Sequence, residues 1–225
     1  DTLHSVVKDG SIDLSAVGLT KEDIQSISQI YIVACGSAWH VGMVAQYVIE
    51  DLAKIPVRVE LASEFRYRKP LLDKNGLVIL ISQSGETADT LAALREAKNR
   101  QVKTLAIVNV VGSSIAREAD NVFYTLAGPE ISVATTKAYS AQLIAVYTLA
   151  LQFAKERNEI EMSEYEKLIK ELDTLPDKIQ EVIDNQEEIQ KFAAKQAAAK
   201  DVFFIGRGID YAVSLEGSLK LKEIS

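Results

Sequence analysis

The residues best suited to chemistry lie in one short turn, Ser82-Gln83-Ser84-Gly85-Glu86-Thr87, which carries three hydroxyl side chains. Five apolar residues, 77–81, come directly before this turn and predict a buried strand, and a helical pattern begins directly after it at Ala88. Backbone N–H groups are exposed at a helix N-terminus, and the helix dipole adds partial positive charge there. The turn therefore suits a phosphate group, and the absence of a lysine within it argues against a nucleotide P-loop.

A second turn of similar composition, Cys35-Gly36-Ser37-Ala38, follows the apolar run 30–34. In an open parallel sheet, ligands bind at the carboxyl ends of the strands, where neighbouring crossovers diverge. If the strands 30–34 and 77–81 flank that point, Ser37 faces the hydroxyl groups of the Ser82–Thr87 turn across one pocket. The alternative is an ordinary strand-to-helix connection, in which Ser and Gly are common. Two such turns in one sheet favour the pocket.

Two further stretches have a functional and an ordinary interpretation. Residues 130–137 form a polar, β-branched loop that opens a helix; Thr135 or Thr136 is expected to be its N-cap, and the alternative is a wall of the same pocket. Glu216, Lys220 and Glu223 share one helix face at spacings of four and three. Such a trio is usually a surface ion pair, but in a pocket it supplies a general base and a cation for an oxyanion.

The remaining reactive side chains give weaker signals. Cys35 is expected to be a small buried residue, because no histidine is placed by the pattern to activate it as a nucleophile. His4 and His40 are isolated, so we predict no metal site and no cofactor. Gly206-Arg207-Gly208 lacks the third glycine and the downstream acid of a dinucleotide fingerprint.

The elements that must position these residues alternate between strand and helix. Predicted strands are 30–34, 57–61, 77–81, 103–109 and 121–126, and predicted helices are 39–54, 62–67, 88–100 and 113–119. This alternation predicts an α/β fold, a three-layer αβα sandwich with a five-stranded parallel sheet, followed by C-terminal helices.

We divide the chain into four parts. Residues 1–28 form a peripheral segment in which Thr20 and Asp23 cap a short helix, and 29–160 form the first domain. Its last helix, 136–157, is apolar on much of its surface, which hints at a subunit or domain interface. Residues 161–200 form two charged connecting helices, 163–175 and 176–200.

The end of the chain repeats the layout of the first strand unit. The strand 202–205, the turn 206–208 and the helix 212–225 indicate the start of a second, truncated copy of the domain in 201–225. The chain begins without Met and ends inside a helical pattern, so we interpret it as a fragment of a longer polypeptide; the alternative is a processed or frayed terminus.

Composition narrows the function classes. The formal net charge is −7 without a long basic patch, which argues against a nucleic-acid partner, so a phosphate must be held by local dipoles and hydroxyl groups. The single cysteine excludes an internal disulfide and fits a reducing, cytoplasmic setting. No apolar run approaches the roughly 18 residues of a membrane span.

The chain closely resembles the glutamine:fructose-6-phosphate amidotransferase (glucosamine-6-phosphate synthase) family, and the match runs in order through nearly its whole length. The motifs that carry the resemblance are Cys35–Ser37, Ser82–Thr90, Glu130–Ala138 and Leu215–Ser225. The Ser-Gln-Ser-Gly-Glu-Thr motif marks sugar isomerase (SIS) domains in general, with their flavodoxin-like or Rossmann-like fold. The Leu-Lys-Leu-Lys-Glu-Ile-Ser motif narrows the resemblance to the synthases.

The resemblance implies an enzyme in which a glutaminase domain releases ammonia and two SIS domains convert fructose 6-phosphate to glucosamine 6-phosphate, the first step towards UDP-N-acetylglucosamine. This chain would be the first SIS domain, the connecting helices and the start of the second domain, and alone it would be inactive. Together with the apolar helix, the resemblance favours a homodimer.

The resemblance also implies roles for individual residues. Lys220 and Glu223 match the catalytic lysine and the enolisation base of the family, whose ring-opening histidine and second catalytic lysine would lie beyond Ser225. Ala38 stands where many relatives have a serine, which puts one phosphate contact in doubt. The sugar phosphate, fructose 6-phosphate or glucosamine 6-phosphate, would be held by Ser37, Ser82, Gln83, Ser84 and Thr87, with Val133 and Thr135 lining the sugar.

Two other functions fit an SIS domain. One is a non-catalytic module that senses a phosphosugar, and the other is a simple phosphosugar isomerase that performs no amination. The Lys220-Leu221-Lys222-Glu223 motif speaks against the simple isomerase.

Overall fold

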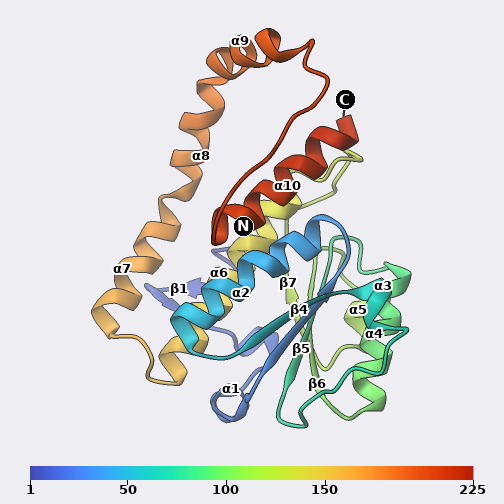
Figure 1. The fold of residues 1–225 in the computed structure, drawn as a ribbon. Coiled ribbons are helices and arrows are strands. Elements are labelled where there is room, and N and C mark those ends of the chain that lie inside the picture. The colour runs from blue at the N-terminus through green and yellow to red at the C-terminus, as the bar shows by residue number, and fades with distance from the viewer. Residues whose placement is uncertain (225) are drawn as a thin grey trace.

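A five-stranded parallel sheet between two helical layers forms the centre of the molecule, as seen in a computed structural model that describes residues 1–224 (Figure 1). The strands, in spatial order, are β4 (Val57–Leu61), β3 (Ile30–Ala34), β5 (Leu77–Ser82), β6 (Lys103–Val108) and β7 (Asn121–Tyr124). All neighbouring strands are parallel. The predicted fold class is therefore confirmed, with all five predicted strands of the sheet in place to within two residues.

The alternation of side chains along each strand builds two separate cores. Ile30 and Ile32 of β3 belong to one core, whereas Tyr31 and Val33 belong to the other, and every residue of the strand is buried. On the first face lie α2 (Ser37–Ala53) and α6 (Lys137–Glu156), with α1 (Lys21–Ser26) and α7 (Met162–Asp173) against α6. On the other face lie α3 (Ala62–Phe65), α4 (Ala88–Asn99) and α5 (Ser114–Glu118).

The N-terminal segment is fastened to the amino ends of β6 and β7. It contains an antiparallel pair, β1 (Val7–Lys8) and β2 (Ser11–Ile12), that sequence reasoning did not predict, then a 3₁₀ turn at Ser15–Val17 and α1. The predicted cap of α1 is confirmed, because the Thr20 hydroxyl accepts from the Asp23 N–H and the Asp23 carboxylate accepts from the Thr20 N–H, both at 3.1 Å.

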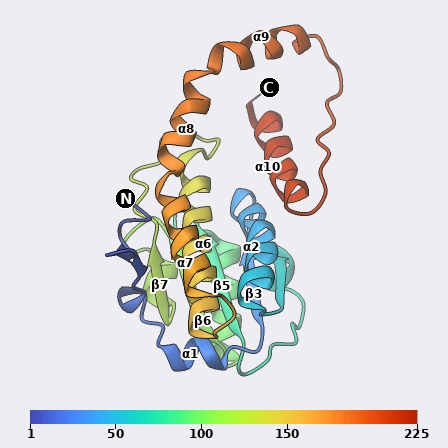
Figure 2. The same cartoon turned by 90° about the vertical axis from the view of Figure 1, so that its left-hand side faces the viewer.

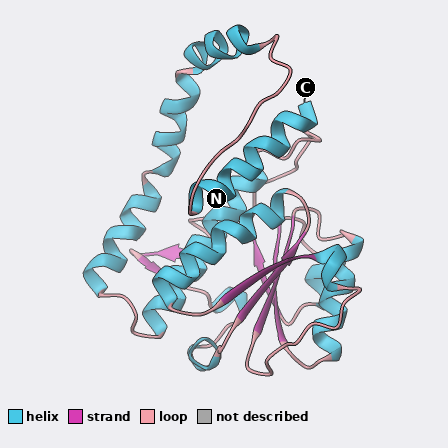
Figure 3. Ribbon diagram, in the orientation of Figure 1, coloured by secondary structure: helices cyan, strands magenta, loops and turns pink. Residues whose placement is uncertain are grey.

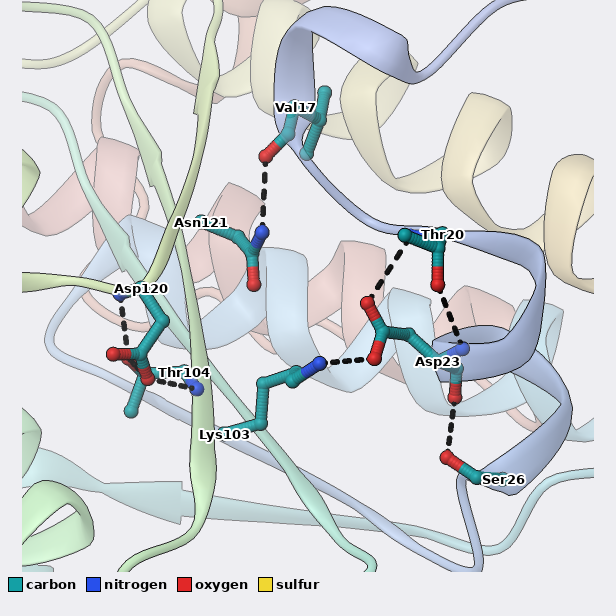
Figure 4. A network of polar contacts seen from close by, with 8 residues as sticks. All are labelled: Val17, Thr20, Asp23, Ser26, Lys103, Thr104, Asp120 and Asn121. Atoms are coloured by element: carbon teal, nitrogen blue, oxygen red, sulfur yellow. Dashed lines mark hydrogen bonds and ion pairs between the residues drawn. The ribbon is translucent and has the colours of Figure 1, made fainter.

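Figure 4 shows how this cap is linked to the sheet. The Lys103 ammonium pairs with the Asp23 carboxylate and holds the pKa of that carboxyl below its usual value. The Asn121 amide donates to the carbonyl of Val17 at 3.3 Å. These contacts lie at the edge of the sheet opposite the strand ends that carry the polar turns, so they stabilise the fold without bordering the predicted pocket.

The apolar surface of α6 is covered mainly within the chain. Twelve of its residues are buried, and α2, α1 and α7 pack against it. Tyr165, Ile169 and Leu172 of α7 join the same core. The burial that hinted at an interface is thus largely intramolecular, and the homodimer stays a prediction.

The predicted helix 176–200 is wrong as one element. The structure forms α8 (Leu175–Asp184) and α9 (Gln186–Gln196), and neither has a buried residue. The break falls at Asn185, whose side-chain amide donates to the carbonyl of Glu181 at 3.1 Å and competes with the helical hydrogen bonds. Figure 2 shows α8 and α9 projecting beyond the sheet, with a long segment returning to α10 (Ile209–Ile224).

The predicted strand 202–205 is not formed, and this segment is a loop (Figure 3). The physical reason is that a strand needs a neighbour for its backbone N–H and C=O groups, and no strand within residues 1–224 runs beside it. The side chains of Phe203 and Ile205 are correspondingly 87% and 89% exposed. The predicted helix 212–225 exists as α10 and begins three residues earlier, while its last residue, Ser225, lies outside the described residues.

Candidate functional site

A cavity of about 580 Å³ lies at the carboxyl ends of β3, β5 and β6. In the strand order, β3 has β4 on one side and β5 on the other, so the crossovers diverge where sequence reasoning placed the pocket. The structure brings all nine predicted site residues to this one cavity, while their roles stay predictions. They are Ser37, Ser82, Gln83, Ser84, Thr87, Val133, Thr135, Lys220 and Glu223.

The Ser82–Thr87 turn is held by hydrogen bonds among its own residues. The hydroxyl groups of Ser82 and Thr87 lie 2.9 Å apart, and the Gly85 N–H donates to the Ser82 hydroxyl at 3.0 Å. The Ser84 hydroxyl accepts from the Glu86 N–H at 3.2 Å. The turn is therefore preorganised, with its polar groups gathered at the cavity.

Two long helices begin at the cavity without a side-chain cap. At the start of α4, the Thr87 side chain makes no capping hydrogen bond, and at the start of α2 the capping position is Gly36, which has no side chain to offer. Helix N-terminal N–H groups that lack a cap need another acceptor, and an anion is well suited to that place. The Glu86 carboxylate accepts a hydrogen bond from the Ser114 N–H of α5 at 2.7 Å. It therefore does not occupy the place that an anion would take at the start of α4.

The loop before α6 forms a wall of the cavity through Val133 and Thr135. Thr136 is the N-cap residue of α6, as one of the two expected candidates, but its side chain makes no capping hydrogen bond. The Glu130 carboxylate accepts from the Thr136 N–H at 3.3 Å instead. This contact fixes the loop at the start of α6 without capping the first turn of the helix, and Thr135 lines the cavity.

Asn109, at the end of β6, anchors the same loop and was missed by sequence reasoning. Its amide donates to the Gly128 carbonyl at 2.8 Å, and its carbonyl oxygen accepts from the Ala127 N–H at 2.7 Å and the Thr125 hydroxyl at 3.1 Å. The available signal was a polar side chain directly after a buried strand, the same signal that identified Ser82.

The polar face of α10 closes the cavity. The Lys220 ammonium lies 2.5 Å from the Glu223 carboxylate and 3.6 Å from that of Glu216. The predicted ion pair is thus formed, and Lys220 and Glu223 also border the cavity, whereas Glu216 lies buried behind them.

The Glu216 carboxylate is buried but has polar partners. Its carboxylate lies 2.7 Å from Nδ1 of His40 on α2, a contact that sequence reasoning missed. Burial alone would raise the pKa of Glu216, but hydrogen bonding from His40 and Ser37 and the charge of Lys220 outweigh it and lower that pKa below its usual value.

The other residues that sequence reasoning singled out play smaller parts here. Cys35 borders the cavity and is half-buried. Within residues 1–224, no three His, Cys, Asp or Glu side chains gather in a way that would hold a metal ion. Across the same range, no helix combines the length and the apolar character needed to cross a membrane.

Comparisons with known proteins agree with this geometry. A model of the SIS domain family matches residues 23–152. The proteins named glutamine–fructose-6-phosphate aminotransferase (isomerizing) from Caldanaerobacter subterraneus subsp. tengcongensis and Clostridium acetobutylicum are each 57% identical to this chain over 226 positions. The match covers 100% of this chain but 37% of each relative, so the chain spans just over a third of their length.

A solved structure supports the same relationship. The C-terminal domain of glucosamine-fructose-6-phosphate aminotransferase from Francisella tularensis matches with a TM-score of 0.95 at 40% sequence identity. The match covers 100% of this chain and 63% of that chain.

Proposed function

Because this chain belongs to the SIS domain family, we propose that its cavity binds a sugar phosphate and forms part of an aminotransferase that makes glucosamine 6-phosphate from fructose 6-phosphate. The observation that carries the proposal is the convergence on one cavity of two uncapped helix starts and a hydroxyl-rich turn. A neutral sugar would not need this concentration of anion-binding groups.

The phosphate is held by dipoles and hydroxyl groups. Among the described residues that line the cavity, Lys220 is the only cation, and it is already paired with Glu223. The N–H groups at the starts of α2 and α4 and the hydroxyl groups of Ser37, Ser84 and Thr87 therefore supply the binding. Ser82 supports Thr87 at 2.9 Å, and Gln83, Val133 and Thr135 shape the rest of the cavity.

The chemistry falls to Lys220 and Glu223. Conversion of a ketose to an aldose moves a proton between C1 and C2, which requires a base and a positive group for the developing enolate oxygen. Glu223 serves as the base and Lys220 as the cation, and their contact at 2.5 Å keeps both at the cavity until substrate enters between them. This pair favours a catalytic domain over a module that only senses a phosphosugar.

The other parts of the activity belong to the longer protein. We assign ammonia release to a glutaminase domain, and ring opening to residues that follow this chain. Within the chain, residues 29–160 form the first SIS domain, 161–200 the connection and 201–225 the beginning of a second. The whole protein functions as a homodimer in the cytoplasm.

Removing hydroxyl groups of the turn is expected to weaken binding of fructose 6-phosphate. Ser84→Ala and Thr87→Ala each delete a donor to a charged phosphate, a loss of about 1.5–3 kcal/mol, or roughly ten- to hundred-fold in Kd. Isothermal titration calorimetry on the two variants measures this effect. Ser26→Ala is the matched control, because the Ser26 hydroxyl bonds only the Asp23 carbonyl, at 2.8 Å, at the opposite edge of the sheet. Unchanged affinity in both turn variants would refute the phosphate assignment.

The chain by itself is expected to produce no glucosamine 6-phosphate. The chain spans 37% of its relatives' length, and on this proposal ammonia release and ring opening reside in the remainder. Mass spectrometry after incubation with fructose 6-phosphate and glutamine tests this, with an ammonium salt replacing glutamine in a second reaction. Product in either reaction would show that the division of roles is wrong, while leaving the binding proposal to calorimetry.

A further inference from the structure

A buried ionic hydrogen bond joins α10 to the first domain. His40 of α2 is 8% exposed and Glu216 of α10 is 6% exposed, and their Nδ1 and Oε2 atoms lie 2.7 Å apart. An imidazole N–H is a donor and a carboxylate oxygen an acceptor, so the two groups are chemically complementary at this distance. The two residues are 176 positions apart in the chain, and they connect the helix after the first strand with the last helix.

This is the hydrogen bond of α10 that is buried, among those of the described residues. Ala212 and Glu216 are the only buried residues of α10 within the described part of the chain, and they face α2. An alanine buries little apolar surface, so apolar contact alone fixes α10 weakly. The segment 201–207 that leads to the helix is exposed, and its contacts with α10 include the Ser214 hydroxyl, which donates to the Ile205 carbonyl at 3.1 Å.

The hydrogen bond continues into the face of α10 that borders the cavity. The other carboxylate oxygen of Glu216 lies 3.6 Å from the Lys220 ammonium, which in turn lies 2.5 Å from Glu223. His40 satisfies one oxygen of Glu216 and leaves the second for Lys220. Without His40, the full charge of Glu216 would compete with Glu223 for the same ammonium group.

The charge of Glu216 affects a neighbouring tyrosine. The pKa of the Tyr139 hydroxyl on α6 is raised to about 12, mainly by burial and secondly by the negative charge of Glu216. A buried polar pair is a poor way to gain stability, because apolar residues of the same volume hold helices together equally well or better. Its best attested advantage is the fixing of one arrangement, which is what a helix bearing catalytic groups requires.

We propose that His40 is a positioning residue, which orients Glu216 and through it sets Lys220 between two carboxylates at the cavity. The part of this inference that concerns catalysis by Lys220 rests on the proposed function. The attachment of α10 does not depend on that function and is measured separately.

Three variants of the whole chain test the proposal. His40→Leu keeps the bulk and removes the donor. His40→Asn keeps a donor near the Nδ1 position, because the asparagine amide nitrogen superposes on it. His4→Leu is the matched control, because His4 makes a hydrogen bond with Asp173 in which the two side chains are 71% and 67% exposed.

The first measurement is hydrogen exchange of the backbone amides of α10. In His40→Leu these amides are expected to exchange about ten-fold faster or more, the factor expected when a hydrogen bond to a buried charge is lost. His40→Asn and His4→Leu are expected to exchange like the unchanged protein. Equal protection in His40→Leu and the unchanged protein, or failure of Asn to restore protection, would overturn the proposal.

The second measurement compares two probes by calorimetry. Fructose 6-phosphate should bind His40→Leu about ten-fold more weakly. Inorganic phosphate should lose clearly less affinity, because the Ser82–Thr87 part of the phosphate site is held by its own hydrogen bonds and not by α10. Equal losses for both probes would mean a general structural defect and would overturn the positioning role.

If the unchanged protein binds neither probe, the proposed function fails, and hydrogen exchange still decides whether His40 holds α10. If His40→Leu does not fold, His40→Gln replaces it. The glutamine amide lies one methylene group further from the backbone than Nδ1, so the donor is misplaced while the side chain stays polar.

Discussion

Gly85→Ala is expected to weaken binding of fructose 6-phosphate by at least about a hundred-fold, since a displacement of about 1 Å in a positioned site can have an effect of this size. A Cβ atom at this residue would lie 2.0 Å from the Ser113 hydroxyl oxygen and 2.5 Å from the Ser113 Cβ. Ser113 is 3% exposed and cannot move aside. The backbone of Gly85 also has a φ of +66°, which a side chain disfavours.

The displacement would spread in two directions. The Gly85 N–H donates to the Ser82 hydroxyl at 3.0 Å, and the Gly85 carbonyl accepts from the Ile115 N–H of α5 at 3.0 Å. The turn and α5 would therefore shift together. Overpacking and positive-φ strain together should lower the free energy of unfolding by about 2–5 kcal/mol. Calorimetry gives the affinity, and urea unfolding followed by circular dichroism gives the stability.

Gly112→Ala is the matched control for Gly85→Ala. Gly112 also has a positive φ, +73°, but a Cβ there would meet no atom within 4 Å. This variant should show the backbone strain of about 1–2 kcal/mol without loss of affinity. Adding Ser113→Gly to Gly85→Ala removes the atoms that clash and should restore part of the binding. Wild-type affinity in Gly85→Ala would contradict the role of the turn.

The sheet and the two polar turns were predictable because parallel strands are buried on both faces. Such strands appear in the sequence as continuous apolar runs, and the run 77–81 ends where the turn begins. The strand order then follows from general rules of α/β sheets, so the amino-acid pattern alone is enough to place Ser37 opposite Ser82. The local sequence was therefore sufficient to predict the two turns that form the anion-binding part of the site.

Contacts between distant segments were not predictable from local pattern. His40 and Glu216 lie on separate amphipathic helices, and neither helix pattern identifies its partner. Asn109 appears ordinary until the loop at Gly128 folds back onto it. The run 202–205 has strand-forming residues, but strand formation depends on a neighbouring strand that a local pattern cannot supply.

Tyr165→Ala is expected to lower the free energy of unfolding by about 3–5 kcal/mol, the range for removal of a large aromatic side chain from a core. Tyr165 has no exposed surface, and its ring lies against the Lys155 ammonium at 4.8 Å from the ring centre. Its hydroxyl accepts from the Ile12 N–H at 2.9 Å and donates to the Gln152 side chain at 3.1 Å. One residue of α7 thus connects β2 with α6, and urea unfolding measures its contribution.

The size of this effect bears on where the first domain ends. The sequence division at residue 160 assigns α7 to the connection, where a substitution should have little influence on the domain. Phe192→Ala in α9 is the control, since Phe192 is 66% exposed and its removal should change stability by no more than about 0.5 kcal/mol. A large loss for Tyr165→Ala beside a small one for Phe192→Ala would move the boundary to the end of α7. If both variants unfold at nearly the same urea concentration as the unchanged protein, α7 is a connecting helix and the division at 160 stands.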